Sequence, residues 1–156
     1  MAVFAGAHGI ANGLDAVLDA AAELQKRGNT SVRIVLIGDG KLKPGLVKRA
    51  SELGLANVVF CDPVSKEKLT GLFSAADLGL QILANVPAFY DGTSPNKFFD
   101  YLASGMPVLI NYPGWLTQLV RERACGYAVP PADPSAFADA LEHAAAHRTE
   151  LAAAGL

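Results

Sequence analysis

The stretch TSPNKFFDYLASGMPVL, from Thr93 to Leu109, decides the fold, because a polar turn, a short amphipathic helix and a buried strand follow one another in it without a gap. A helix is expected to begin near Pro95, since proline suits the first turn and Ser94 and Asn96 can cap it. The free N–H groups and the positive dipole end of such a helix favour a phosphate. The stretch therefore predicts an anion-binding helix start beside a sheet.

Two charged side chains follow this expected helix start. Lys97 adds a positive charge that could approach a phosphate. Asp100 lies about one turn later, where its carboxylate could accept hydrogen bonds from vicinal hydroxyls. The alternative that this segment alone leaves open is a capped surface helix with a solvated lysine and aspartate.

The rest of the chain alternates short apolar runs with stretches of helical period, which is typical of a parallel sheet covered by helices. Strands are expected at Ala2–Ala5, Val32–Ile37, Val58–Phe60, Leu78–Ile82, Val108–Ile110 and Tyr127–Val129. Helices are expected at Leu14–Arg27, Lys43–Leu53, Lys66–Ala75, Asn96–Ser104, Trp115–Glu122 and Pro134–His147. Right-handed crossovers make this an α/β fold, a doubly wound, Rossmann-like, six-stranded parallel sheet of order 3-2-1-4-5-6. Its ligands are expected at the carboxyl ends of the strands, near the switch between strands one and four.

Length and composition predict a single domain over residues 1–156, since 51% of the residues are hydrophobic and 18% are charged. A formal net charge of −2 gives no electrostatic case for nucleic acid as a partner. Cys61 and Cys125 lack the spacing of a metal or redox motif, and we expect both to be reduced. The sequence has no apolar run near the ~20 residues that cross a bilayer, so we expect a cytoplasmic domain.

The loop from Gly6 to Gly13, after the first strand, is a second candidate ligand site. Gly6 and Gly9 would allow a ligand to approach the backbone closely. The loop has neither the GxGxxG spacing of a dinucleotide site nor the GK[ST] of a Walker loop. His8 could donate to a phosphate or to a transferring sugar, and the alternative is a solvated loop histidine.

The loop after the second strand again places glycine and cations where a strand hands over to a helix. Gly38 is followed by the two cations Lys41 and Lys43. The alternative is a plain turn capped by Asp39.

Several pieces of the sequence occur together in a known order. They are FAG near the start, VLIGDG at the second strand, NVVF at the third, SAADLGL at the fourth, SPNKFFDYLASGMPVL, and GYAVPP followed by Asp133 and an alanine-rich helix. Together they resemble the C-terminal, nucleotide-sugar-binding half of GT-B glycosyltransferases of the large retaining family that includes sucrose and lipopolysaccharide synthases. Pro95, Lys97, Asp100, Tyr101 and Ala103 match the Pro-x-Lys-x-x-acid-Tyr-x-Ala pattern of bacterial transferases that build O-antigen, capsule or exopolysaccharide units from UDP-sugars.

The resemblance implies transfer of a hexosyl or N-acetylhexosaminyl group from a UDP-sugar with retention at the anomeric carbon. It implies no metal or other cofactor, because a helix dipole and cations would stabilise the leaving diphosphate. The acceptor would be a glycan or a lipid-linked sugar, held by an N-terminal GT-B domain that this chain lacks. We therefore expect the isolated domain to bind nucleotide without turnover, and the full-length enzyme could lie peripheral to the inner membrane.

The resemblance also assigns roles to single residues. Of the pair of glutamates that marks the family, the second position is Asp100 here, the first is Gly92, and only the neighbouring Asp91 could substitute. The base would pack near Val64. Many members carry an Arg and a Lys in the first loop that bind the diphosphate, and these positions read Ala7 and Asn12. Lys97, Lys41 or Lys43 would then have to pair with the phosphate charge instead.

The residues expected at the donor site are Gly6, Gly9, Gly38, Lys43, Val64, Gly92, Thr93, Ser94, Asn96, Lys97 and Asp100, with Asp91 and His8 as catalytic candidates and no metal ligand. Two other readings of the chain remain. A degenerate domain would bind nucleotide weakly or only pack against a partner, and an epimerase of UDP-sugars would share the fold.

Overall fold

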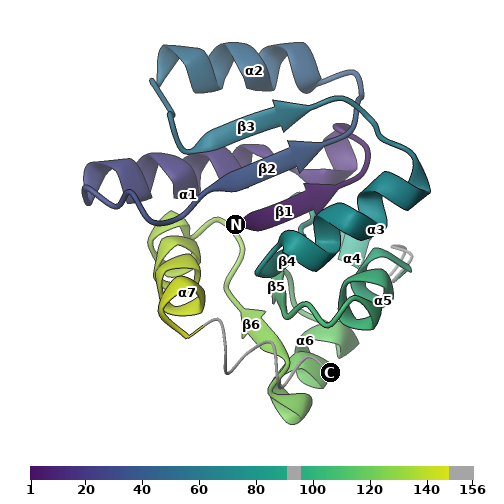
Figure 1. Cartoon of the computed structure of the whole chain (residues 1–156). Coiled ribbons are helices and arrows are strands. Elements are labelled where there is room, and N and C mark those ends of the chain that lie inside the picture. The colour runs from purple at the N-terminus through teal and green to yellow at the C-terminus, as the bar shows by residue number, and fades with distance from the viewer. Residues whose placement is uncertain (91–95, 148–156) are drawn as a thin grey trace.

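The structure is a computed structural model that describes residues 1–90 and 96–147. Its centre is a six-stranded parallel sheet of order β3-β2-β1-β4-β5-β6, as the sequence predicts (Figure 1). The strands are β1 (Ala2–Ala5), β2 (Ile34–Ile37), β3 (Val58–Cys61), β4 (Leu78–Gln81), β5 (Val108–Ile110) and β6 (Gly126–Ala128). All six predicted strands are present, with ends that differ from the expected ones by no more than two residues.

All six predicted helices are present, five between the strands and α7 after β6, and two further short elements are not predicted by the sequence. The predicted helices are α1 (Asp15–Lys26), α2 (Lys43–Glu52), α3 (Lys66–Ala75), α5 (Asn96–Ala103), α6 (Trp115–Arg123) and α7 (Pro134–Ala146). The additional elements are the 3₁₀ turn η1 (Ile10–Asn12) and the single-turn helix α4 (Pro87–Tyr90). Both are too short to show a helical period in the sequence.

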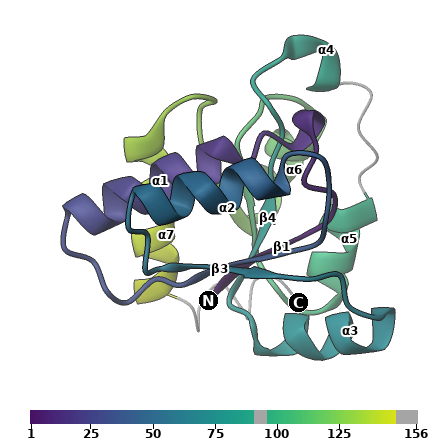
Figure 2. The same cartoon turned by 90° about the horizontal axis from the view of Figure 1, so that it is seen from above.

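Helices cover both faces of the sheet (Figures 1 and 2). An apolar core lies between the sheet and the helices on each face. One core gathers side chains of α1, α2 and α7, among them Leu18, Leu46 and Phe137. The other gathers side chains of α3, α5 and α6, among them Phe73 and Tyr101. Because the crossovers change face between β3 and β4, the carboxyl ends of β1 and β4 form the point where the winding reverses.

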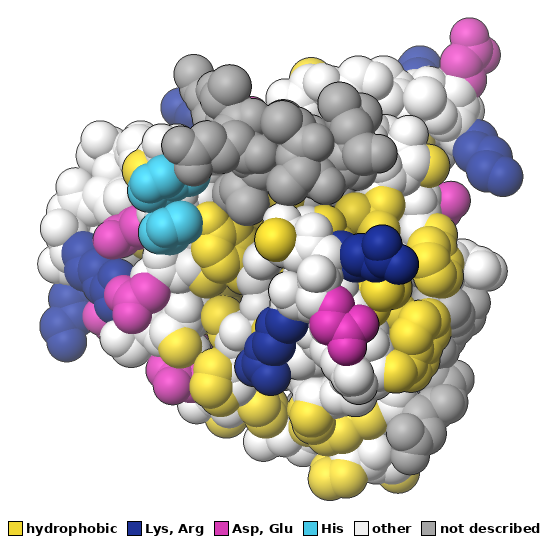
Figure 3. All heavy atoms as spheres, turned by 90° about the horizontal axis from the view of Figure 1, so that it is seen from below, with side chains coloured by type: hydrophobic (Ala, Val, Ile, Leu, Met, Phe, Trp, Pro, Cys, Tyr) yellow, Lys and Arg dark blue, Asp and Glu magenta, His cyan; other side chains and the backbone are white. Residues whose placement is uncertain are grey.

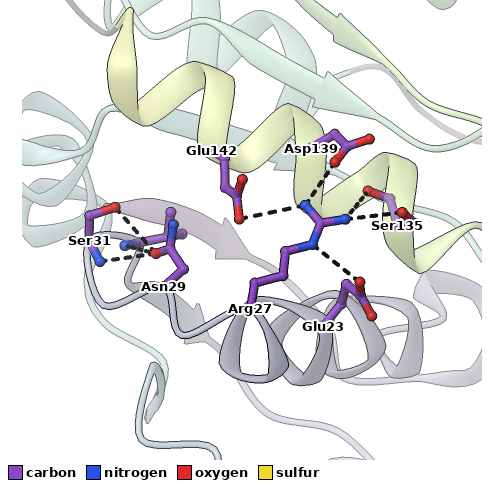
Figure 4. Close-up of polar contacts among 8 residues, drawn as sticks. Glu23, Arg27, Asn29, Ser31, Ser135, Asp139 and Glu142 are labelled. Atoms are coloured by element: carbon purple, nitrogen blue, oxygen red, sulfur yellow. Dashed lines mark hydrogen bonds and ion pairs between the residues drawn. The ribbon is translucent and has the colours of Figure 1, made fainter.

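A polar cluster fastens α7 to α1 (Figure 4). Arg27 donates to Asp139 at 2.7 Å, to Glu23 at 3.2 Å and to the Ser135 hydroxyl at 3.0 Å. The hydrogen bond to Asp139, then that to Glu23, raises the pKa of Arg27. The cluster is structural, because it joins the last turn of α1 to the first turns of α7.

The second strand begins two residues later than predicted, and the reason lies in the turn before it. The Asn29 side chain accepts hydrogen bonds from the backbone N–H groups of Ser31 and Val32 (Figure 4). These two residues are therefore held in a turn rather than in the ladder, and β2 starts at Ile34.

The surface carries charges of both signs. On the face shown in Figure 3, acidic and basic side chains are interspersed with hydrophobic ones. Within residues 1–90 and 96–147, no helix is long and apolar enough to cross a membrane. Cys61 and Cys125 are both free thiols.

Candidate functional site

A pocket of about 370 Å³ lies at the carboxyl ends of β1, β2 and β3. Residues 5–7, residues 37–39, Pro63, Val64 and Leu69 line it. It therefore brings together Gly6, Gly38 and Val64, three of the residues predicted for the donor site. Two other hollows, of about 380 Å³ beside Met1 and about 470 Å³ beside α6, contain none of the predicted residues.

The loops that follow β1 and β2 are bonded to each other beside this pocket. The His8 N–H donates to the Asp39 carbonyl at 2.9 Å, and the Leu42 N–H donates to the His8 carbonyl at 3.0 Å. Gly38 has a φ of +143°, and a Cβ atom there would lie 1.9 Å from the Gly6 carbonyl oxygen. Gly38 is thus required for the contact between the loops, whether or not a ligand also approaches it.

The imidazole of His8 lies inside the loop that was expected to present it. Its side chain has no exposed surface and packs against Phe4 and Phe60, while Nδ1 lies 3.1 Å from the Gly6 carbonyl oxygen. Burial lowers the pKa of His8. The solvated-histidine alternative is therefore wrong, and a ring without exposed surface does not contact a sugar or phosphate in this structure.

The first loop closes on itself where many relatives carry cations. The Asn12 amide donates to the Ala7 carbonyl at 2.7 Å, across the two positions that the resemblance singled out. A Cβ atom on Gly9 would meet nothing within 4 Å, so no close contact requires this glycine. The loop supplies backbone groups but no positive side chain to the pocket.

Lys43, a candidate phosphate ligand, is instead bonded to oxygen atoms of the protein. Its ammonium donates to the carbonyls of Gly38 at 2.7 Å and Cys61 at 3.2 Å, and to the Asp62 carboxylate at 3.1 Å. An ammonium has three donors, so all of them are used. The Lys43 side chain is only 14% exposed. It joins the ends of β2 and β3 and offers no free proton to a ligand, whereas Lys41 beside it is exposed.

Lys97 lies beside Gly6, one of the residues that line the pocket, and its ammonium packs against an aromatic ring. From α5 it reaches across the end of β1, and its ammonium stands 3.9 Å from the centroid of the Phe4 ring. A Cβ atom on Gly6 would lie 2.6 Å from this Nζ. Burial lowers the pKa of Lys97 to about 8. In the described part of the chain no carboxylate pairs with it, so a half-buried cation borders the pocket without an anion.

The remaining predicted residues of this region are exposed or not described. Asn96 and Asp100 lie on the exposed side of α5, and among residues 1–90 and 96–147 the Asp100 carboxylate has no hydrogen-bond or ion-pair partner. Asp91, Gly92, Thr93 and Ser94 lie outside the described residues.

Tyr101 also supports the site, although the sequence indicates it only as part of the family motif. It is fully buried on α5, its hydroxyl donates to the Leu80 carbonyl at 3.2 Å, and it accepts from the Ala5 N–H at 3.3 Å. Its ring stands over Gly79, where a Cβ atom would lie 2.4 Å from Cγ. A glycine inside the apolar run of β4 is the signal that could have indicated such a close approach.

Among residues 1–90 and 96–147, the apolar pocket is bordered at Gly6 by one cation without a carboxylate partner, and one carboxylate without a partner lies on the helix beside it. An anionic ligand with a flat ring and hydroxyl groups suits that combination. Within the described residues, no group of three or more His, Cys, Asp or Glu side chains is placed to hold a metal ion.

Comparison with known proteins adds the family. The D-inositol 3-phosphate glycosyltransferase of Streptomyces scabiei is 35% identical over 127 residues, which are 80% of this chain and 27% of that protein. The protein of the same name from Mycobacterium bovis is 36% identical over 135 residues, 83% of this chain and 26% of that protein. The chain thus spans about a quarter of the length of these curated relatives.

Solved structures share the fold. The C-terminal domain of LpcC, a group 1 glycosyl transferase of Francisella tularensis, has a TM-score of 0.79 at 18% identity over 99% of this chain and 80% of that chain. Anabaena HepE in complex with UDP-glucose has a TM-score of 0.79 at 18% identity over 99% of this chain and 41% of that chain. Both confirm the Rossmann-like architecture of a GT-B half. Residues 1–147 match the family described as Glycosyl transferases group 1, and the chain belongs to that family.

Proposed function

We propose that this chain is the donor-binding half of a glycosyltransferase that uses a UDP-sugar. The observation that carries the proposal is the Lys97 ammonium, which borders the pocket at Gly6 without a carboxylate partner among the described residues. A desolvated cation is unfavourable until an anion pairs with it, and the diphosphate of a nucleotide sugar provides that anion.

The donor would lie along the carboxyl edge of the sheet. Its base would pack in the pocket beside Val64, its diphosphate would meet Lys97 and the first turn of α5, and its ribose hydroxyls would reach Asp100. The fold shared with HepE, whose structure holds UDP-glucose, supports this placement.

The wider activity belongs to the longer protein of which such a domain is a part. In this proposal an N-terminal GT-B domain binds the acceptor, the sugar is transferred with retention and without a metal or other cofactor, and Asp91 approaches the donor sugar. A role in bacterial surface polysaccharide synthesis is supported by the fold shared with WaaG, a glycosyltransferase involved in lipopolysaccharide biosynthesis. The acceptor would then be a glycan or a lipid-linked sugar, and the complete enzyme a cytoplasmic protein peripheral to the inner membrane.

A second candidate function has its own supporting observation. Ala7 and Asn12 replace the cations of the first loop, Asn12 bonds back to Ala7, and the Lys43 ammonium is fully occupied. A domain with these features could be degenerate and only pack against a partner.

Titration calorimetry of this chain with UDP and with UDP-glucose separates the two functions. The donor-binding proposal predicts saturable binding to the wild type, reduced about tenfold or more in Lys97→Met, because a charge-assisted contact contributes about 1.5–3 kcal/mol. Lys26→Met is the matched control, since it removes one positive charge from the last turn of α1, away from the pocket. Absence of heat with a folded wild type, or equal affinity of the Lys97 variant, would support the degenerate domain instead.

A further inference from the structure

The strands β1 and β4 separate before their carboxyl ends. Pairing between them covers Ala2 with Leu78 and Val3 with Gly79, whereas β1 pairs with β2 as far as Ala5. If the β1–β4 ladder continued, the Ala5 N–H would donate directly to the Leu80 carbonyl. The sheet is therefore open by one hydrogen bond at the point where its winding reverses.

The Tyr101 hydroxyl fills this gap. It accepts from the Ala5 N–H at 3.3 Å and donates to the Leu80 carbonyl at 3.2 Å, so it stands between the two groups that would otherwise bond each other. Burial raises the pKa of Tyr101 well above its usual value, so the hydroxyl keeps the proton that it donates. The absence of a Cβ atom at Gly79 makes room for the ring.

Tyr101 and Lys97 are four residues apart on α5 and lie on the same side of the helix. Anchoring Tyr101 in the gap therefore fixes the height of the first turn of α5 above the end of β1. At that height the Lys97 ammonium contacts the Phe4 ring and borders Gly6. Without the hydroxyl, the strands could close on each other or leave two backbone groups unpaired, and α5 would lose its link to β1.

We infer that Tyr101 is a positioning residue for donor binding: its hydroxyl bridges β1 and β4 where the sheet reverses and so holds the Lys97 ammonium at Gly6, where the diphosphate of a nucleotide sugar binds. The inference rests on the proposed function for the identity of the ligand. The placement of Lys97 by Tyr101 does not depend on whether a ligand is bound.

The test compares Tyr101→Phe with Tyr112→Phe. Both remove one buried hydroxyl, but the Tyr112 hydroxyl accepts from Gln81 and links β4 to the loop after β5, whereas the Tyr101 hydroxyl links β1 to β4. For each variant, UDP affinity is measured by calorimetry, and the pKa of Lys97 is measured without nucleotide by NMR of ¹³C-methylated lysines, with Lys97→Arg assigning the signal. Thermal unfolding reports the loss of stability in both variants.

Tyr101→Phe is expected to weaken UDP binding about tenfold, the size of one lost buried hydrogen bond, and to move the pKa of Lys97 from about 8 toward 10.5. Tyr112→Phe is expected to lose stability while both readouts stay at wild-type values. Unchanged readouts in Tyr101→Phe, or equal changes in both variants, would overturn the inference. Failure of the wild type to bind UDP would contradict only the proposed function. The titration of Lys97 without nucleotide would still show whether Tyr101 positions its ammonium.

Should Tyr101→Phe not fold, the same measurements are made on Ala5→Pro, which removes the N–H on the other side of the bridge. The same two shifts are expected, and wild-type values in that variant would count against the inference.

Discussion

Two lysines at the carboxyl edge of the sheet differ in what their ammonium groups contact. The loops after β1 and β2 bond to each other through His8, and the ammonium of Lys43, at the ends of β2 and β3, meets three oxygen acceptors. Between β1 and β4, the ammonium of Lys97 faces an aromatic ring. Both lysines lie beside a glycine loop, so this position does not tell a structural cation from one that is available to a ligand. The atoms that each ammonium contacts make that distinction.

The two lysines should also differ in their effect on stability. Lys43 satisfies backbone carbonyls at the ends of two strands and should stabilise the fold. Lys97 loses hydration and, within the described part of the chain, gains no carboxylate partner, so it should cost stability at neutral pH, as its lowered pKa indicates. Substitution of each lysine should therefore change the free energy of unfolding in opposite directions.

Gly38→Ala is expected to have the largest effect, because it forces apart the loops that follow β1 and β2. The new Cβ atom would lie 1.9 Å from the Gly6 carbonyl oxygen, at a φ of +143°. We expect a loss of about 3–5 kcal/mol in the free energy of unfolding, or no folded protein. Urea denaturation followed by circular dichroism measures it.

The matched control is Gly45→Ala on α2, where a Cβ atom would meet nothing within 4 Å. This variant should gain about 0.5–1 kcal/mol, because alanine loses less backbone entropy than glycine in a helix. A Gly38 variant as stable as the control would mean that the two loops do not touch in solution.

Lys43→Met should cost about 2–3 kcal/mol, since the carbonyls of Gly38 and Cys61 lose a charged donor in a largely buried place. The free energy of unfolding at pH 7 checks this value, and Lys48→Met, on an exposed part of α2, should stay within about 0.5 kcal/mol of wild type. Unchanged stability combined with lost UDP binding would restore Lys43 to the role of phosphate ligand that the sequence predicts.

Lys97→Met should change stability in the opposite direction. The pKa of Lys97 is about 8 in the folded state, below the ordinary 10.5, so the unfolded chain binds more protons between these two values. The cost of the buried charge is full below pH 8, and it is relieved as pH rises toward 10.5. We therefore expect the variant to be about 1–3 kcal/mol more stable than wild type at pH 7, with 3 as the upper limit from the shift.

This advantage should shrink as pH increases, and unfolding at pH 7, 8, 9 and 10 measures the trend. Wild type and variant are compared at each pH, so titrations common to both cancel. A constant difference across the range would show that the Lys97 ammonium keeps its hydration in the folded protein.

Most of the fold could be predicted from the sequence because apolar runs and helical periods alternate without ambiguity. Gly6 and Gly38 of the pocket could also be predicted, since they follow strands whose order comes from the crossover rule, whereas Val64 is indicated only by the family resemblance. The role of Lys43 could not, because its acceptors are mainly backbone carbonyls, which carry no sequence signal. The burial of His8 depends on Phe60 of β3, far along the chain, and local pattern does not report such contacts.

The smallest predicted effect concerns His8, whose buried imidazole packs against Phe4 and Phe60. Burial lowers its pKa in the folded state below the ordinary 6.5, so the unfolded chain binds the extra proton first as pH falls. The contribution of neutral His8 to stability is therefore present above pH 6.5 and decreases as pH falls below that value. The charged groups Lys43, Lys97 and Asp39 act on this imidazole, and the two lysines favour its neutral form.

His8→Phe removes the titration and keeps a ring between Phe4 and Phe60. We expect the wild type to lose stability relative to this variant between pH 7 and pH 5, as measured by urea midpoints at constant ionic strength. The variant also loses the bond to the Gly6 carbonyl, so it should be the less stable protein at pH 7 and should approach the wild type at pH 5. Parallel midpoints at all pH values would mean that the imidazole is hydrated, and that the loop after β1 opens in solution.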